Sequence, residues 1–254
     1  MRREGMRVYF HNDFYAVYTH DPAAAAGRME AVVQAIDPHV EICSFAPATE
    51  NDLLAVHPEQ HIAYVREEGL YDIAALAAGG AIRAAEQSLE EPGFALIRPP
   101  GHHASADSCW GFCYFNNMAV SLCKLHSGGR IKSAFILDFD LHFGDGTVNI
   151  LGRRDWVDIL NPQAFDRRSY LDQVKRALDA TRADVIAVSA GFDNHVRDWG
   201  NVLLTEDYRT MGAWVRQAAD RNNGGCYGIL EGGYNHDVLG ENVLAFLEGM
   251  MGDV

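Results

Sequence analysis

Carboxylates and an imidazole follow an apolar run near the middle of the chain. The run 134–138 reads as a strand that ends in Asp138, and Asp140 and His142 come directly after it. Side chains at positions i, i+2 and i+4 of an extended strand share one face, so we expect these three residues to point the same way. Two neighbouring carboxylates repel each other, and burying both without a counter-charge costs several kcal/mol. The pattern therefore predicts a bound cation, with a solvated acidic loop as the alternative.

Polar, glycine-rich segments also follow four other strand-like apolar runs, which begin at residues 94, 156, 185 and 226. Open α/β sheets bind ligands beyond the carboxyl ends of their strands. We therefore expect the polar side chains after these runs to meet Asp140 and His142 in one crevice. These side chains are His102, His103, Asp193 and Tyr234.

The acidic cluster has the composition of a metal site. A catalytic zinc ion takes three protein ligands and leaves one position for water. Asp140, His142 and Asp193 would supply three ligands and two negative charges. Because two of these ligands are oxygen donors, iron(II) and manganese also suit the set. His57 and His61 have the spacing of a metalloprotease helix, but a proline replaces the glutamate that this motif requires, which excludes that reading.

Helix-like segments alternate with the strand-like runs that must position these residues. They cover residues 71–90, 116–126, 169–182, 206–221 and 238–250. This alternation is typical of a mostly parallel sheet with helices on both faces. A chain of 254 residues can bury one substantial core, so we expect a single domain over residues 1–254.

The composition restricts the partners and the compartment. A formal net charge of −14 argues against nucleic acid or an anionic membrane as a partner and favours cationic ligands. No apolar run approaches the ~20 residues of a membrane span, and the start of the chain has no apolar core of signal-peptide length. Five cysteines are too few for a disulfide scaffold, so we expect a cytoplasmic protein. Cys113 lies in an apolar run and is expected to be a buried small hydrophobe.

Five motifs, in this order, resemble the zinc-dependent histone deacetylases and their bacterial relatives, including the acetylpolyamine amidohydrolases. They occupy residues 98–103, 111–117, 138–147, 189–193 and 230–235, and a looser match begins at residue 27. The resemblance implies an arginase/deacetylase-like α/β fold. It also implies hydrolysis of an N-acyl amine, such as acetyl-lysine, an acetylpolyamine or a small acylamide, by zinc-activated water.

The resemblance assigns proton transfer to the tandem histidines. His103 would act as general base and then as general acid, with His102 as its electrostatic partner. Asp138 and Asp145 would orient His102 and His103, respectively, and fix their tautomers.

The resemblance assigns the other motif residues to the metal and the substrate. The zinc ligands would be Asp140, His142 and Asp193, with water in the open position. The hydroxyl of Tyr234 would stabilise the oxyanion of the tetrahedral intermediate. Gly111 and Phe112 would line an apolar tunnel for the linear part of the substrate.

The chain departs from the family pattern near the metal and at the rim. Phe143 replaces a second histidine, which leaves the ligands intact in more apolar surroundings. Asn161 replaces a serine that helps to bind a structural potassium ion beside Asp138, although an amide oxygen can also coordinate potassium. The segments 67–72 and 162–168 are short, and Phe165 is the candidate for a second tunnel aromatic. A short rim favours small acylated amines and leaves an entrance that a second copy of the chain could complete.

Two other functions stay open. A ureohydrolase with two manganese ions on the same fold would need a closely repeated pair of aspartates, whereas the segment 189–195 supplies only Asp193. A catalytically silent ligand-binding module would lack the oxyanion tyrosine or the base, whereas Tyr234 and His103 are both present.

Overall fold

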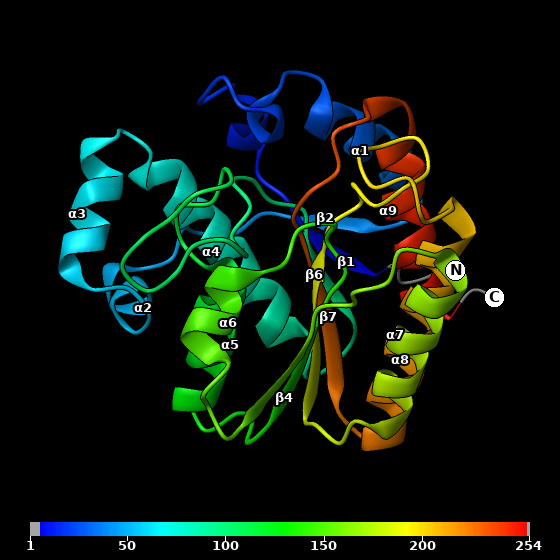
Figure 1. Cartoon of the computed structure of the whole chain (residues 1–254). Coiled ribbons are helices and arrows are strands. Elements are labelled where there is room, and N and C mark those ends of the chain that lie inside the picture. Colours follow the sequence, from blue (N-terminus) through cyan, green and yellow to red (C-terminus); the bar gives the residue numbers. More distant parts are fainter. Residues whose placement is uncertain (1–5, 253–254) are drawn as a thin grey trace.

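A seven-stranded parallel sheet forms the centre of the computed structural model, which describes residues 6–252 (Figure 1). The strand order is β2-β1-β3-β7-β6-β4-β5, and every neighbouring pair is parallel. The strands are β1 (Arg7–Tyr9), β2 (Glu41–Cys43), β3 (Gly93–Ala95), β4 (Ala134–Asp138), β5 (Val157–Leu160), β6 (Val185–Ala190) and β7 (Gly225–Leu230). The expected α/β fold with a mostly parallel sheet is confirmed.

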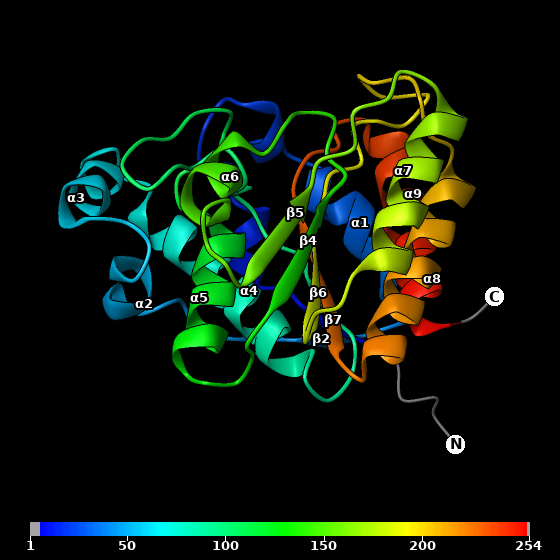
Figure 2. The same cartoon turned by 60° about the horizontal axis from the view of Figure 1, so that its bottom comes forward.

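Helices cover both faces of this sheet (Figures 1 and 2). One layer contains α1 (Arg28–Ile36), α7 (Arg167–Ala180), α8 (Thr205–Asn222) and α9 (His236–Met251). The other contains α4 (Tyr71–Gln87), α5 (Asn117–Ser127) and α6 (Asp145–Leu151), with α2 (Glu50–Leu54) and α3 (Glu59–Glu67) packed outside it. Two short 3-10 helices, at Asn12–Tyr15 and Pro22–Ala24, precede α1. Within residues 6–252, no helix is both long enough and apolar enough to cross a lipid bilayer.

The burial of the central strands explains which strands could be recognised in the sequence as apolar runs. Every residue of β4, β6 and β7 is buried, because helices cover both faces of a parallel sheet. Such strands read as continuous apolar runs, and the sequence predicted all three. The three-residue strands β1 and β2 were not predicted, since they are too short to show a pattern and β2 is partly exposed.

One local expectation was wrong. Strand β4 ends at Asp138, so Asp140 and His142 lie in the following loop and do not share a strand face with it. The backbone N–H of Asp140 donates to Oδ1 of Asp138 (3.3 Å), and the N–H of His142 donates to Oδ1 of Asp140 (2.9 Å). These side-chain bonds compete with strand pairing and turn the chain, while still gathering the three side chains at one place.

Candidate active site

The site predicted from the sequence lies beyond the carboxyl ends of four strands, at one edge of the sheet (Figure 1). The loop after β3 carries the tandem histidines, and the loop after β4 carries Asp140 and His142. Asp193 follows β6, and Tyr234 follows β7. The parallel arrangement explains the convergence, because parallel strands all end at the same edge.

Asp140, His142 and Asp193 form a compact donor group whose ligand atoms lie within 4.8 Å of one another. Nδ1 of His142 is 3.3 Å from Oδ1 of Asp140 and 3.1 Å from Oδ2 of Asp193. Both carboxylates are buried, whereas the His142 side chain is 40% exposed, so the group opens to solvent on the imidazole side. Oδ2 of Asp193 is buried and, apart from this contact with His142, has no hydrogen-bond partner among the described residues. This donor set fits a divalent metal ion with one side open for water and substrate.

The electrostatics of the group favour positive charge. Burial and the neighbouring Asp140 carboxylate raise the pKa of Asp193. Hydrogen bonds to the carboxylates of Asp140 and Asp193 raise the pKa of His142 to about 10. Two buried like charges therefore need a cation between or beside them.

Backbone groups hold the two carboxylates in place. The N–H of Gly232 donates to Oδ2 of Asp140 (2.8 Å), and the N–H of Leu141 donates to Oδ1 of Asp193 (3.0 Å). A Cβ atom on Gly232 would lie only 2.8 Å from Oδ2 of Asp193, which is closer than Cβ atoms approach other heavy atoms in proteins. Only glycine lets the backbone after β7 approach both acidic side chains this closely.

The tandem histidines are each paired with the carboxylate that the sequence assigned to them. Nδ1 of His102 lies 3.1 Å from Oδ2 of Asp138, and Nδ1 of His103 lies 2.6 Å from Oδ1 of Asp145. Both imidazoles are buried, and their ring centroids are 4.0 Å apart. The pairing through Nδ1 leaves Nε2 of each ring free for chemistry, and Nε2 of His102 lies 3.8 Å from Oδ1 of Asp140.

The two histidines differ in charge. Burial alone would lower the pKa of His102, but the carboxylates of Asp140 and Asp138 outweigh it and raise the pKa well above its usual value. Burial, and then the neighbouring His102, lower the pKa of His103 to about 4. At neutral pH, His102 is therefore the cation and His103 the neutral ring that can accept a proton.

Tyr234 is held by the loop that follows Asp193. Its backbone N–H donates to Oδ2 of Asp198 (2.8 Å), and its ring stacks on Trp199 with the centroids 4.0 Å apart. Burial, and then the charges of Asp140 and Asp193, raise the pKa of the Tyr234 hydroxyl. The hydroxyl therefore stays protonated and can act as a hydrogen-bond donor.

Gly111 and Phe112 have an unusual backbone conformation beside His103 and Tyr234. Both have positive φ values, 58° and 68°, and this conformation is strained for phenylalanine. A Cβ atom on Gly111 would collide with the His103 ring. The Phe112 ring lies edge-on to Tyr234, with the centroids 6.2 Å apart. These two residues therefore line the approach to the tandem histidines and the tyrosine.

Two buried histidines tie the segment around Phe112 to the rest of the fold. Nδ1 of His57 is 2.9 Å from the carbonyl oxygen of Ala106, and its Nε2 accepts the N–H of Asn116 (3.0 Å). Nε2 of His61 is 2.8 Å from the carbonyl oxygen of Tyr114. Burial lowers the pKa of His57 to about 4, which keeps the ring neutral. These histidines support a loop and do not form a metalloprotease site.

Glu231 has a supporting role that the sequence reasoning did not assign. Its Oε2 accepts the backbone N–H groups of Gly101 (2.7 Å) and His102 (3.2 Å), which fixes the turn that carries the histidines. His102, Cys113 and Glu231 also form a buried group of potential metal donors. Burial raises the pKa of the Cys113 thiol well above its usual value, so it stays protonated and matches the expected small hydrophobe. A charged residue directly after a buried strand was the available signal for Glu231.

Exposed aromatic side chains at the entrance were also missed. Trp110 and Trp199 are 57% and 53% exposed, and they contact His103 and Tyr234, respectively. Phe165, the candidate second tunnel aromatic, is fully exposed. The role of Phe165 stays a prediction, whereas the two tryptophans contact residues of the site directly. Large apolar side chains next to the site motifs were the signal that could have identified them.

The two departures from the family pattern lie beside the metal ligands. Phe143 is 47% exposed and belongs to the surface around His142. Oδ1 of Asn161 accepts the backbone N–H of Gly144 (2.8 Å), so this amide already holds the loop that carries His142. The potassium ion beside Asp138 stays a prediction.

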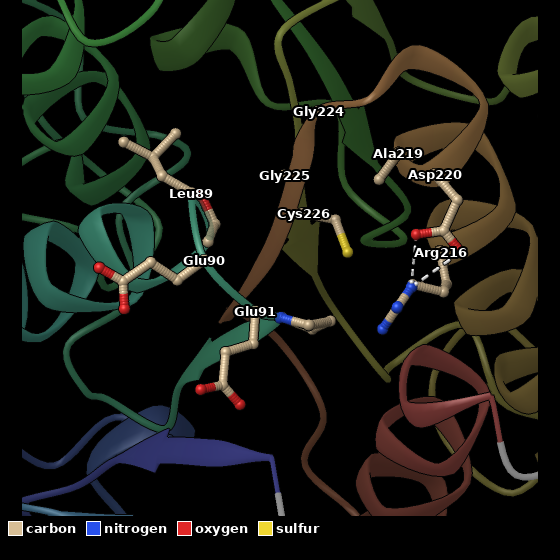
Figure 3. A pocket seen from close by; sticks show the side chains of 11 residues that line it. Leu89, Glu90, Glu91, Arg216, Ala219, Asp220, Gly224, Gly225 and Cys226 are labelled. Carbon is tan, nitrogen blue, oxygen red and sulfur yellow. Dashed lines mark hydrogen bonds and ion pairs between the residues drawn. The ribbon is translucent and has the colours of Figure 1, made fainter.

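A second recess lies at the opposite end of the sheet (Figure 3). It is lined by residues 88–92 before β3, by residues 224–226 at the start of β7, and by α8. Nε of Arg216 donates to both carboxylate oxygens of Asp220 there, so this positive charge is already paired. Because it lies at the amino ends of the strands, this recess is not part of the candidate active site.

Known proteins share both the fold and the sequence family of this chain. The structure matches the crystal structure of the HDA15 HD domain with a TM-score of 0.84 and 22% identity, over 99% of this chain and 91% of that chain. This likeness shows that the two chains share the same α/β fold. The family model of the histone deacetylase domain matches residues 23–170 and 152–250. The chain belongs to the histone deacetylase family.

Two relatives are similar over most of their length. A probable deacetylase of Methanothermobacter thermautotrophicus is 31% identical over 97% of this chain and 91% of the relative. A histone deacetylase-like amidohydrolase of Pseudomonas aeruginosa is 30% identical over 91% of this chain and 79% of the relative. Membership of the family supports hydrolase activity of the deacetylase or amidohydrolase type on an acylated substrate, and it implies a metal cofactor. The donor group of Asp140, His142 and Asp193 fits that cofactor.

Proposed function

We propose that this chain hydrolyses the amide of an N-acyl amine to a carboxylate and an amine. The observation that carries the proposal is a metal-type donor group beside His103: the ring centroids of His142 and His103 are 6.0 Å apart, and His103 is paired with Asp145. Zinc is the cofactor that we propose. Bound by Asp140, His142 and Asp193, it would acidify a water molecule and polarise the amide carbonyl.

His103 moves the proton in this proposal. Its free Nε2 takes a proton from the attacking water and later gives it to the departing amine, because an amine is a poor leaving group until it is protonated. Asp145 holds Nδ1 at 2.6 Å and stabilises the imidazolium that forms between these two steps. The carboxylates of Asp140 and Asp138 raise the pKa of His102, and its protonated ring would stabilise negative charge near the reacting carbonyl.

Tyr234 donates its hydroxyl hydrogen bond to the oxyanion that develops from the carbonyl oxygen. Stacking on Trp199 and the backbone bond to Asp198 hold the tyrosine before substrate binds. A donor that is already in position gains more in the transition state than in the ground state, and this difference accelerates the reaction.

Small acylated amines are the proposed substrate class. Only residues 68–70 connect α3 to α4, so this part of the rim carries no long loop that could grip a polypeptide. The net charge of −14 favours substrates that carry a positive charge. Apolar faces of Phe112, Trp110 and Trp199 would contact the carbon chain beside the amide.

A hydrolysis screen tests the proposal. The protein would be loaded separately with zinc, iron(II) or manganese and offered acetyl-lysine peptides, acetylated polyamines, small acylamides and acetylated histones. We expect zinc-dependent release of amine, with small acylated amines cleaved at least as well as peptides or histones. A folded, metal-loaded protein that binds these ligands without cleaving them would favour the silent binding module. Urea formation from a guanidino compound with two manganese ions bound would favour the ureohydrolase.

Replacing Tyr234 with phenylalanine should lower kcat by roughly two to three orders of magnitude. The substitution removes one hydroxyl group, while the ring can still stack on Trp199 and the three metal ligands are unchanged. Steady-state kinetics on the best substrate and elemental analysis would measure turnover and metal content together. A metal-replete, folded variant with nearly the parent kcat would exclude the oxyanion role of Tyr234.

A further inference from the structure

Trp110 makes two contacts with the parts that would carry out proton transfer. Its ring lies against the imidazole of His103, with the centroids 4.0 Å apart and the planes inclined by 34°. Its indole Nε1–H donates to Oδ2 of Asp145 at 2.9 Å. The same carboxylate accepts the Nδ1–H of His103 through its other oxygen, Oδ1, at 2.6 Å. One indole therefore contacts both members of the histidine–carboxylate pair.

The second hydrogen bond restricts the Asp145 carboxylate, which is more exposed to water than the equivalent carboxylate beside His102. The Asp145 side chain is 44% exposed, whereas the Asp138 side chain that holds His102 is fully buried. Surrounding atoms fix the plane of Asp138, but water could compete for Asp145 and let it rotate. Hydrogen bonds to both oxygens fix the plane of the carboxylate, and the carboxylate in turn fixes the imidazole plane.

The indole also covers His103. The imidazole side chain is only 5% exposed, although Asp145 next to it is 44% exposed and Trp110 itself is 57% exposed. The ring of His103 touches His102 and Trp110 at equal centroid distances of 4.0 Å. Because packing against two rings and a hydrogen bond at Nδ1 restrict its rotation, His103 has one orientation available for its free Nε2.

We propose that Trp110 is a positioning residue for His103, and this inference rests on the proposed amide hydrolysis. The indole takes no proton and need not touch the reacting atoms. It holds the Asp145 carboxylate through its N–H and holds the imidazole through its ring, so that Nε2 of His103 stays aligned for proton transfer. Loss of this alignment slows the chemical step and changes substrate affinity less.

The first test examines the contact itself and does not depend on turnover. The chain contains four tryptophans, so a ¹H–¹⁵N spectrum should contain four indole N–H resonances. Trp110→Phe identifies the resonance of Trp110 by its disappearance. Asp145→Ala should shift that resonance to lower ¹H frequency and leave the other three in place, because only Trp110 would lose a charged acceptor. An unshifted Trp110 resonance in folded Asp145→Ala would overturn the inference.

The second test separates the N–H group from the ring by kinetics. Trp110→Phe keeps a ring on His103 but removes the N–H, and we expect kcat to fall by roughly tenfold with KM within about twofold. Trp110→Ala removes both contacts, and kcat should fall further. Trp214→Phe on α8, where the ring faces Lys175, is the matched control and should equal the parent.

The kinetic outcomes distinguish this inference from the proposed function. In an active parent, an unchanged kcat of Trp110→Phe, or a change in KM alone, would make Trp110 only a wall of the entrance and overturn the inference. A metal-loaded parent that cleaves no acyl amine would instead refute the proposed function, and the catalytic role of Trp110 with it. Because Trp110→Phe is conservative, a failure of Trp110→Ala to fold leaves the decisive comparison intact.

Discussion

Replacing Asp193 with alanine is expected to remove the metal and the hydrolytic activity together. Asp193 is fully buried and supplies one of the two carboxylates in the donor group. Its loss leaves Asp140 and His142, which give one negative charge and two ligands for a divalent ion. We therefore expect a larger loss of metal affinity than the ~10–100-fold that removal of an outer hydrogen bond to a ligand costs. Elemental analysis and steady-state kinetics on the same preparation would measure both effects.

The control for this experiment is Asp172→Ala on α7. Asp172 is exposed, so its replacement makes the same change in net charge far from the donor group. The control should keep the metal content and the turnover of the parent. Circular dichroism would establish that Asp193→Ala is folded, although the backbone N–H of Leu141 loses its bond to Oδ1 of Asp193 in this variant. Stoichiometric metal in folded Asp193→Ala, or two tightly bound ions in the parent, would refute the single site described here.

The parts of the fold that the sequence predicted are those whose physical cause is local. Strands β4, β6 and β7 are buried on both faces, so each shows as an apolar run that ends in polar residues. The long helices were predicted to within a few residues of their ends, for example α4 at Tyr71–Gln87 against an expected 71–90. Strands β1 and β2 depend on pairing with β3 and with each other, which no local pattern records.

The same distinction applies to the candidate site. The donor group could be predicted because its members follow two apolar runs, even though Asp140 and His142 lie beyond the end of β4. The supporting contacts of Glu231 and Trp110 were not predicted, because they join distant segments and no motif assigned them. Oε2 of Glu231 bonds the turn at His102, which lies 129 residues away in the sequence. These contacts follow from the packing of side chains and not from spacing along the chain.

Replacing His103 with alanine should lower kcat by roughly two to four orders of magnitude and leave the metal in place. The imidazole is the neutral member of the tandem pair, and the proposed reaction needs it twice, for attack by water and for departure of the amine. The metal ligands Asp140, His142 and Asp193 do not include it, so metal content should equal that of the parent. His39→Ala, at an exposed position before β2, is the matched control.

Comparison with His102→Ala gives this experiment its sharpest outcome. The carboxylates of Asp140 and Asp138 raise the pKa of His102, which favours its protonated form and makes it a poorer proton acceptor than His103. Its removal should reduce kcat less than removal of His103. Alanine at 103 also leaves a space bounded by Asp145 and the Trp110 ring, and added imidazole that enters it should restore part of the activity. A larger loss for His102→Ala, with no rescue of His103→Ala by imidazole, would assign the proton transfers to His102 instead.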